Sequence, residues 1–298
     1  MELLLNKIIV TNYGENTISI IDKGNLSYIN TIDLKAIIPA RKGITRAILE
    51  DKQTLLVLDS DNDSLYRIDL NKRELLKQLN LGRCPFRIKS YKDRIFVTNL
   101  DSNSLSIIDK DEFSIIENIY LGEKPTDLAI DEDSGKLFIT NLNSYSISIV
   151  DYENDEVAQI KLPYMPFRVK VDKNGFYILG FINNNTLNSS MLTFFSKNNI
   201  GKWERVIEGI YFDFFKDRDR DLFYLVASED SWLYEFDKNA DIHKKKVYIG
   251  GLTNFINYDL GFLYLNDMVN DKIIVVDIND KQIKRIAVGK EPHDILLT

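Results

Sequence analysis

Proline followed two residues later by a charged side chain recurs along this 298-residue chain. Two of these segments are almost identical, Pro85-Phe-Arg-Ile-Lys89 and Pro166-Phe-Arg-Val-Lys170, and two others carry an aspartate at the same step, Asp127 and Asp294. A guanidinium presents a planar fork of N–H donors that matches a carboxylate or a phosphate group. Converging arginines of this kind would form a binding site for an anionic group.

The same position can be followed into segments that lack the proline. Phe212 is the candidate for this position in the fifth copy, and aromatic or imidazole rings precede the charge at Phe86, Phe167 and His293. These rings would line the same site as the charged side chains. The ligand-binding hypothesis therefore names Arg46, Arg87, Asp127, Arg168, Phe255, His293 and Asp294.

Two interpretations of these charges stay open. Arginine and aspartate can pair with each other, because a charge removed from water must be compensated. The set holds three arginines against two aspartates, so one positive charge is unmatched. Because of that excess, two interpretations remain: the charges form an internal ring of ion pairs, or the arginines bind an external anion.

The residue types that usually perform catalysis are scarce. The chain has two histidines and one cysteine. His243 stands beside Lys244–Lys246 and is expected to be a solvated residue of a loop between strands, and Cys84 has no histidine near it in sequence. A Ser-His-Asp arrangement would need His293 together with a serine that the sequence does not identify. No catalytic residue is assigned, and a protein without enzymatic activity is favoured.

Metal and cofactor motifs are not found either. The segment Asp59-Ser-Asp-Asn-Asp-Ser64 is similar to the start of a calcium loop, but it lacks the glycine at position six and has Leu70 at position twelve. It is read as an acidic turn. We expect no metal and no cofactor.

Composition restricts the class of partner. The net charge is −7, so general binding to nucleic acid is disfavoured, and the run Lys244–Lys246 is too short to form such a surface. A single cysteine excludes an intramolecular disulfide framework. The beginning of the sequence does not match a secretory signal, and no stretch approaches the length of a membrane span. We expect a cytoplasmic monomer.

Self-similarity reveals what positions these residues. The segment Lys7–Asn12 recurs as Arg94–Asn99 and as Lys136–Asn141. A second segment recurs seven times at separations of 40 to 47 residues, ending at Asp22, Asp69, Asp109, Asp151, Ser196, Asp237 and Asp277. Seven repeats therefore fill the chain.

Each repeat holds four short segments with the two-residue alternation of strands. In the third repeat these are 94–99, 104–109, 115–122 and 125–131. Four strands at this period predict an all-β, closed, seven-bladed β-propeller of antiparallel blades. We expect one domain over residues 1–298, with Pro292–Thr298 and the first strands of the chain completing one blade together.

Three segments carry a family resemblance: Val10-Thr11-Asn12-Tyr13, Val97-Thr98-Asn99 and Ile139-Thr140-Asn141. With the Ser/Thr-rich run that follows each of them, they resemble the YVTN-type β-propeller repeat family. The resemblance implies a rigid ring that binds proteins or ligands, in many members outside the cytoplasm. The innermost strand of such repeats opens Pro–x–Gly, so the resemblance implies that the charged residues replace this glycine at one mouth of the central channel.

The fifth repeat departs from the others. Gly180–Ser190 forms an enlarged loop where the other repeats use about four residues. The repeat is also unusually aromatic, which favours packing between blades over binding. The function we expect is a non-enzymatic scaffold that presents the charged mouth to a protein partner or a small anionic ligand. A lactone hydrolase or lyase acting at the mouth and a cell-envelope interaction module are the alternatives.

Overall fold

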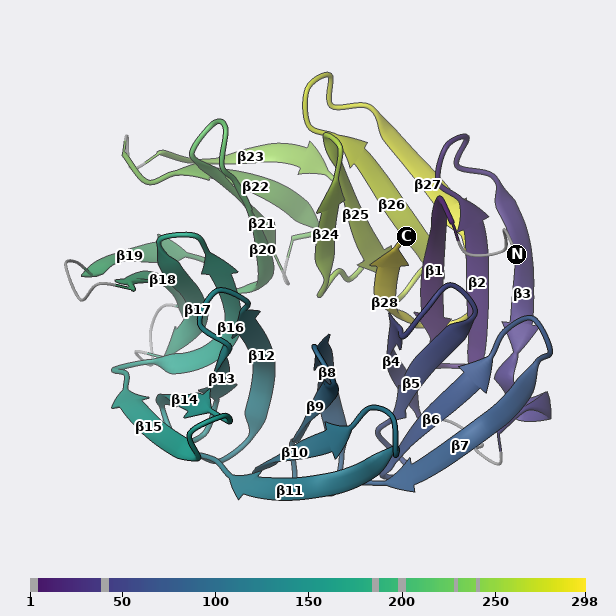
Figure 1. The fold of residues 1–298 in the computed structure, drawn as a ribbon. Coiled ribbons are helices and arrows are strands. Elements are labelled where there is room, and N and C mark those ends of the chain that lie inside the picture. The colour runs from purple at the N-terminus through teal and green to yellow at the C-terminus, as the bar shows by residue number, and fades with distance from the viewer. Residues whose placement is uncertain (1–4, 39–42, 184–187, 198–201, 228–229, 240–241) are drawn as a thin grey trace. The chain divides into compact units, whose positions relative to one another are not determined.

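The computed structural model describes residues 5–38, 43–183, 188–197, 202–227, 230–239 and 242–298. These residues form 28 strands in seven four-stranded antiparallel sheets, with one short 3-10 helix at Leu34–Ala36 (Figure 1). The predicted all-β, seven-bladed β-propeller class is confirmed. Residues 80–211 and residues 1–79 with 212–298 make two compact units, called the middle unit and the terminal unit below.

The middle unit holds three blades. Each blade is built from consecutive strands, so every strand neighbour in a sheet is also a neighbour in sequence. The strands are β8 (Pro85–Tyr91), β9 (Arg94–Asn99), β10 (Ser104–Asp109) and β11 (Ser114–Tyr120), then β12 (Pro125–Asp131), β13 (Lys136–Asn141), β14 (Ser146–Asp151) and β15 (Glu156–Lys161), then β16 (Met165–Asp172), β17 (Gly175–Asn183), β18 (Asn188–Ser196) and β19 (Lys202–Glu208).

The terminal unit holds four blades, and one of them joins the two ends of the chain. In that sheet β28 (Pro292–Leu297) pairs with β1 (Lys7–Asn12), as predicted, followed by β2 (Thr17–Asp22) and β3 (Tyr28–Asp33). The other strands are β4 (Ile44–Leu49), β5 (Thr54–Asp59), β6 (Ser64–Asp69) and β7 (Glu74–Asn80), β20 (Tyr211–Asp217), β21 (Leu222–Ala227), β22 (Trp232–Asp237) and β23 (Ile242–Tyr248), and β24 (Ile256–Asp259), β25 (Phe262–Asp267), β26 (Lys272–Asp277) and β27 (Ile283–Ala287).

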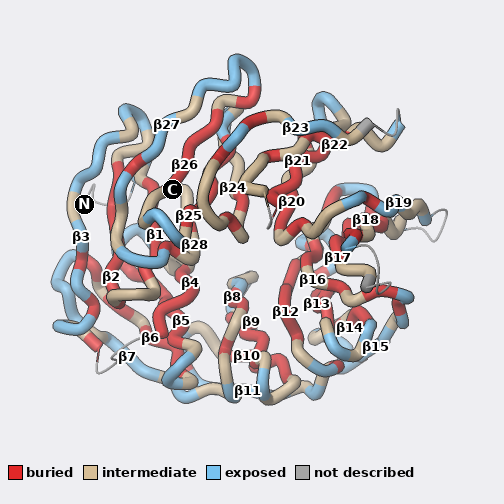
Figure 2. Tube along the Cα trace, turned by 180° about the vertical axis from the view of Figure 1, so that it is seen from behind, coloured by how far each residue is buried: buried red, intermediate tan, exposed pale blue. Residues whose placement is uncertain are grey.

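Burial follows the position of a strand in its blade. The second and third strands are almost wholly buried, as in β9 and β10, whereas the fourth strands are mostly exposed, as in β15 (Figure 2). The first strands of consecutive blades contact one another, β12 with β8 and β16 in the middle unit and β28 with β24 and β4 in the terminal unit. The first strands are therefore the inner strands of each unit. The core lies between the blades.

The recurrent asparagine of the repeats has a structural role. Asn99 ends β9 and is fully buried, and its Nδ2 donates to the hydroxyls of Ser104 at 3.0 Å and Ser106 at 2.9 Å. Asn12 and Asn141 bind the equivalent hydroxyls in their own blades. The Thr-Asn and Ser-x-Ser segments thus join the second strand to the third, because a buried amide must find hydrogen-bond partners.

Two expectations about the fifth and sixth repeats were wrong. The loop expected over Gly180–Ser190 is mostly strand, because β17 and β18 stay paired as far as Asn183 and Asn188. The connection shortens to residues 184–187, which lie outside the described residues. His243 does not lie in a loop but in β23, where its ring stacks on Tyr234 at 4.6 Å.

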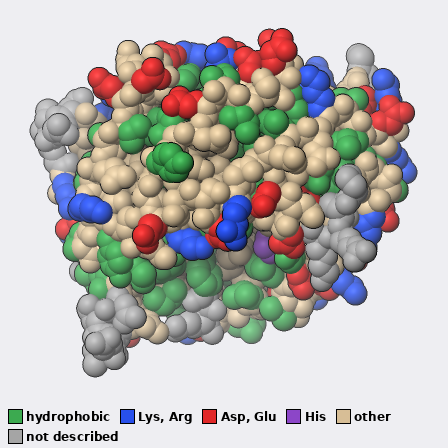
Figure 3. Space-filling model, turned by 90° about the horizontal axis from the view of Figure 1, so that it is seen from below, with side chains coloured by type: hydrophobic (Ala, Val, Ile, Leu, Met, Phe, Trp, Pro, Cys, Tyr) green, Lys and Arg blue, Asp and Glu red, His purple; other side chains and the backbone are tan. Residues whose placement is uncertain are grey.

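The lysines that follow His243 are engaged within the same blade. Lys244 and Lys246 both pair with Glu235, and Lys245 lies 3.0 Å from Asp230. On the face drawn in Figure 3, the described acidic and basic side chains are interspersed. Such a mixture does not favour a nucleic-acid surface on that face.

The aromatic residues of the fifth repeat pack into the protein, in the interpretation that the sequence favoured. Tyr211 and Phe214 are almost fully buried, and Trp203 packs beside Phe194. Among the described residues, no helix is long and apolar enough to cross a membrane.

Candidate binding site on the inner strands

A β-bulge sets the geometry of the charged positions. In five inner strands the pairing register skips one residue directly before the charged or equivalent position; in β8, Pro85 pairs with Asn99 and Arg87 with Thr98. Adjacent residues of a regular strand face opposite sides, and a bulge interrupts this alternation. Phe86 and Arg87 can therefore lie together, with the guanidinium 5.2 Å from the ring centre.

Asp127 connects three inner strands of the middle unit. Its Oδ1 lies 2.8 Å from Nε of Arg87 on β8, and its Oδ2 accepts a hydrogen bond of 3.0 Å from the backbone N–H of Val169 on β16. Arg168 directly precedes this N–H. The middle unit thus places two of the predicted arginines on either side of one predicted aspartate.

The guanidinium of Arg87 is buried and incompletely satisfied. The residue is 8% exposed, and the Nε atom forms no aligned hydrogen bond in the described part of the chain despite its short distance to Asp127. The contact is therefore an ion pair without a well-directed N–H···O bond. Since an arginine carries five N–H donors, Arg87 retains hydrogen-bonding capacity in a desolvated place.

Arg168 lies beside an aromatic pair. It is 2% exposed and its guanidinium is 4.2 Å from the centre of the Phe167 ring, which itself packs on Phe181 at 5.0 Å. A guanidinium stacked on a ring uses its face for the ring, and its N–H donors point outward in the plane. Phe181 belongs to the extended part of the β17–β18 hairpin.

The terminal unit holds the remaining predicted residues. Nη1 of Arg46 lies 3.1 Å from Oδ1 of Asp294 and donates to the carbonyl oxygen of His293 at 2.9 Å. The guanidinium lies 5.3 Å from the ring centre of Phe255. Asp294 also accepts a hydrogen bond from the backbone N–H of Ala47 at 3.3 Å, as Asp127 does from Val169.

His293 stacks on an aromatic neighbour in the same unit. Its ring centre lies 5.0 Å from that of Tyr13, and the Tyr13 hydroxyl donates to Asp61 at 3.0 Å. Burial, followed by the hydrogen bond to Asp61, raises the pKa of Tyr13, so its phenol stays neutral near pH 7. The imidazole is therefore held against a neutral ring.

One inner-strand acid was missed from the sequence. Asp213 on β20 accepts a hydrogen bond of 3.2 Å from the backbone N–H of Ile256, which matches the role of Asp127 and Asp294. The expectation of Phe212 at this position is wrong by one residue. The blade has Tyr211 where four of the other blades have proline, and this change hid the position. The two-residue step from Tyr211 to Asp213 was the available signal.

Asp213 corrects the charge balance. The equivalent positions carry three arginines and three aspartates, so the set as a whole has no excess positive charge. The count of charges over the whole set therefore gives no support to an anion site, and the case for one rests on the geometry of Arg87.

The calcium-like acidic turn is closed by its own backbone. The buried carboxylate of Asp59 accepts hydrogen bonds from the N–H groups of Asp61 and Asn62. Burial raises the pKa of Asp59. Within the described ranges, no group of three or more His, Cys, Asp or Glu side chains is arranged to hold a metal ion.

Comparisons with known proteins support the fold alone. No protein-family model and no curated protein matches the chain. A Bacteroides fragilis protein proposed to be a 6-phosphogluconolactonase is 12% identical, with a TM-score of 0.75 over 98% of this chain and 97% of that one. A functionally unknown protein of Desulfotomaculum acetoxidans is 13% identical, with a TM-score of 0.73 over 98% of each chain.

An enzyme also shares the fold. The virginiamycin B lyase of Staphylococcus aureus is 13% identical, with a TM-score of 0.65 over 83% of this chain and 84% of that one. A histidine-to-alanine variant of that lyase is described as catalytically inactive. At these identities the likeness extends to the β-propeller and not to the activity.

Proposed function

We propose that the chain is a non-enzymatic binding scaffold whose inner strands β8, β12 and β16 hold an anionic group. The observation that carries the proposal is the guanidinium of Arg87. The residue is 8% exposed, and its Nε makes no aligned hydrogen bond among the described residues. A buried donor of this kind loses stability unless it finds an acceptor, and a ligand oxygen would supply one.

The electrostatics of the site favour a carboxylate or a phosphate. Asp127 lies against Arg87 without a well-directed hydrogen bond, so an oxygen of a carboxylate or phosphate would supply the directed acceptor that Nε lacks. Hydrogen bonds between charged groups are strengthened where water is excluded. A small anion and a single acidic side chain present the same acceptor oxygens, so a small ligand and a protein partner would share this chemistry. We also infer that the repeats are of the YVTN type, which the buried asparagine bonds support.

The proposal is tested by ligand-dependent stability. Thermal unfolding of the full chain is measured with citrate, succinate and inorganic phosphate, for wild type and Arg87→Ala. A ligand at one hundred times its dissociation constant adds about 2.7 kcal/mol of stability. We expect this gain in wild type and its loss in Arg87→Ala.

Arg83→Ala is the matched control. Arg83 is an exposed residue of the turn before β8, and its loss removes the same charge. The control should keep the full gain. An equal gain in Arg87→Ala and wild type would refute the site, and so would a loss of the gain in both variants.

A hydrolase or lyase that uses His293 is the second candidate. The stacking of its imidazole on Tyr13 favours it, because a general base must be held in place. The inactive histidine variant of the similarly folded lyase is a reason to test His293 for a catalytic role. Turnover of lactones with a rate inflection near pH 6–7, absent in His293→Ala, would promote this candidate.

A further inference from the structure

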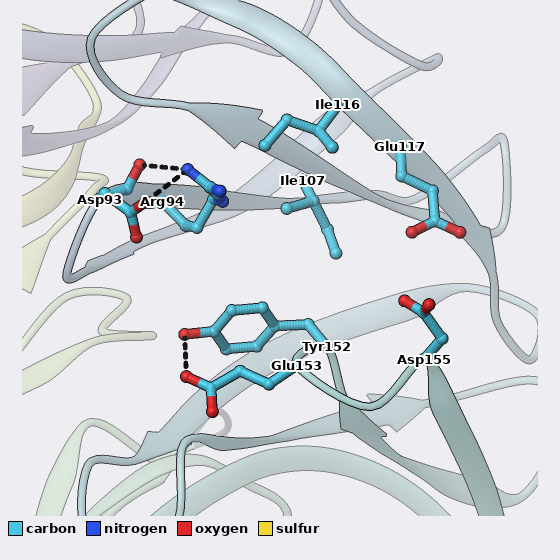
Figure 4. A pocket seen from close by; sticks show the side chains of 8 residues that line it. All are labelled: Asp93, Arg94, Ile107, Ile116, Glu117, Tyr152, Glu153 and Asp155. Atoms are coloured by element: carbon cyan, nitrogen blue, oxygen red, sulfur yellow. Dashed lines mark hydrogen bonds and ion pairs between the residues drawn. The ribbon is translucent and has the colours of Figure 1, made fainter.

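A cavity of about 350 Å³ lies between two blades of the middle unit, far along the strands from Arg87. It is lined by the β8–β9 turn, by β10 and β11, and by the turn between β14 and β15 (Figure 4). This volume is near the lower end of the range of about 300–1,000 Å³ that is typical of ligand pockets. The cavity can take one long side chain.

The cations near one end of the cavity are already neutralised. Nη1 of Arg94 lies 2.7 Å from Asp93 and 3.1 Å from Asp109. Lys92, on the same turn, lies 2.9 Å from Glu153. The positive charges contributed by this region therefore do not compensate the acids at the opposite end.

Two carboxylates at that opposite end face each other. Glu117 on β11 and Asp155 in the β14–β15 turn point toward one another across the cavity (Figure 4). Both are exposed, and neither forms an ion pair with any described residue. Two like charges that face each other repel, and a cation placed between them relieves the repulsion.

Apolar surface connects the two ends. Ile107 is 4% exposed and Ile116 is 51% exposed, and the Tyr152 ring lies opposite them in Figure 4. Burial, then the charge of Glu153, raises the pKa of Tyr152, so this wall is a neutral aromatic ring. Long basic side chains bury an aliphatic stem along apolar surface and keep the charged head at a polar group.

The strand beside the cavity has an open edge. β11 is the last strand of its sheet, and the register with β10 skips Ile116, so a bulge turns this residue out of the ladder. From Glu117 to Tyr120 the pairing is regular, and Tyr120 is 84% exposed. The unpaired backbone groups of an edge strand are a template for an extended segment of another chain.

We propose that this cavity is a socket for an arginine or lysine side chain of a partner protein, whose extended segment lies along Glu117–Tyr120 of β11. The stem would pack on Ile107, Ile116 and Tyr152, and the head would lie between Glu117 and Asp155. The charge of the group bound is opposite to that bound at Arg87. The proposal therefore does not depend on the anion site.

The test is an NMR titration of the isotope-labelled full chain with capped pentapeptides. One peptide has a single central arginine, and its partner has citrulline, which keeps the shape and removes the charge. The arginine peptide should shift the amide signals of the lining residues and of β11. It should bind at least about tenfold more tightly than the citrulline peptide, which corresponds to ~1.4 kcal/mol.

The variant Glu117→Gln/Asp155→Asn should bind the arginine peptide at least about tenfold more weakly than wild type does. Asparagine suits the left-handed backbone of Asp155, whose φ is 55°, so the turn should be kept. The matched control is Asp111→Asn/Glu156→Gln, two exposed acids of the same blades that do not line the cavity. The control and Arg87→Ala should both bind as wild type does.

Three outcomes would overturn the proposal. The citrulline peptide could bind as tightly as the arginine peptide, or the cavity variant could bind as wild type does. Free methylguanidinium could also match the peptide in affinity, which would show a site for a free cation and remove the partner protein. Because Arg87→Ala is titrated in parallel, failure here is distinguishable from failure of the anion site.

Discussion

The carboxylate of Asp127 lies 2.8 Å from Nε of Arg87, on the inner strand of the neighbouring blade, yet the Arg87 N–H is not directed at it. The ion pair therefore compensates the charge of Arg87 but leaves much of its hydrogen-bonding capacity available to another acceptor. The other oxygen of Asp127 is occupied by the backbone of β16. The aspartate is fixed between two strands, and the arginine remains able to accept a further anionic partner.

The first prediction concerns stability. Asp127→Ala leaves the buried charge of Arg87 and the N–H of Val169 without their acceptor, so the free energy of unfolding should fall by about 3–5 kcal/mol. Asp127→Asn keeps an oxygen for Val169 and should cost less. Urea denaturation of both variants gives the comparison, with Asp111→Asn as an exposed control. Equal losses in the two variants would contradict this account of the N–H bond.

Asp127→Asn should also tighten anion binding. The substitution removes the carboxylate that competes with a ligand for Arg87, so the local charge becomes more positive. Calorimetric titration with citrate should show an affinity at least about tenfold higher than that of wild type, which is ~1.4 kcal/mol. Weaker binding by a folded Asp127→Asn protein would mean that Asp127 takes part in holding the ligand.

Gly82 and Asn99 should be energetically coupled. A Cβ on Gly82 would lie 2.7 Å from Cγ of Asn99, so Gly82→Ala should cost about 1–3 kcal/mol through overpacking. Asn99→Ala removes two buried hydrogen bonds and the crowded side chain together. In the Asn99→Ala background, Gly82→Ala should lower the free energy of unfolding by at least about 0.5 kcal/mol less than it does in wild type. A double-mutant cycle in urea measures the coupling, and strict additivity would rule out the contact.

Asp221 should make the terminal unit sensitive to acid. Burial acts to raise its pKa, but hydrogen bonds from Lys238 and Lys216 outweigh burial and lower the pKa to about 2. The ordinary value is about 3.9, so the stabilisation is present above about pH 4 and is lost as the pH falls toward 2. Asp221→Asn should flatten the dependence of the urea midpoint on pH in this range. Asp219→Asn, an exposed neighbour, should keep the wild-type profile.

Much of the fold could be predicted because each repeat carries its own strand pattern. The segments 94–99 and 104–109 match β9 and β10 without any shift, and the blade shared by the termini follows from the repeat spacing. The expected strand 115–122 begins one residue late and ends two late relative to β11, because a bulge at Ile116 disturbs the alternation there.

The site was predictable in its positions and not in its partners. Arg46 and Asp294 are far apart in sequence, and only packing of neighbouring blades brings them to 3.1 Å. Asp213 was missed because the proline that marks four of the other inner strands is replaced by Tyr211. The cavity at Glu117 and Asp155 is built from turns and strands of two repeats, so no single segment of sequence carries its signature.

The central claim is that Arg87 binds an external anion, and the most direct measurement is the NMR signal of its side-chain Nε–H. The signal is assigned by its disappearance in Arg87→Lys. During titration of the wild-type chain with citrate, the account predicts a saturable shift of this signal, with the Nε–H signal of Arg83 unchanged. An Arg87 signal that stays in place at saturating citrate would contradict the claim, whatever citrate does to stability.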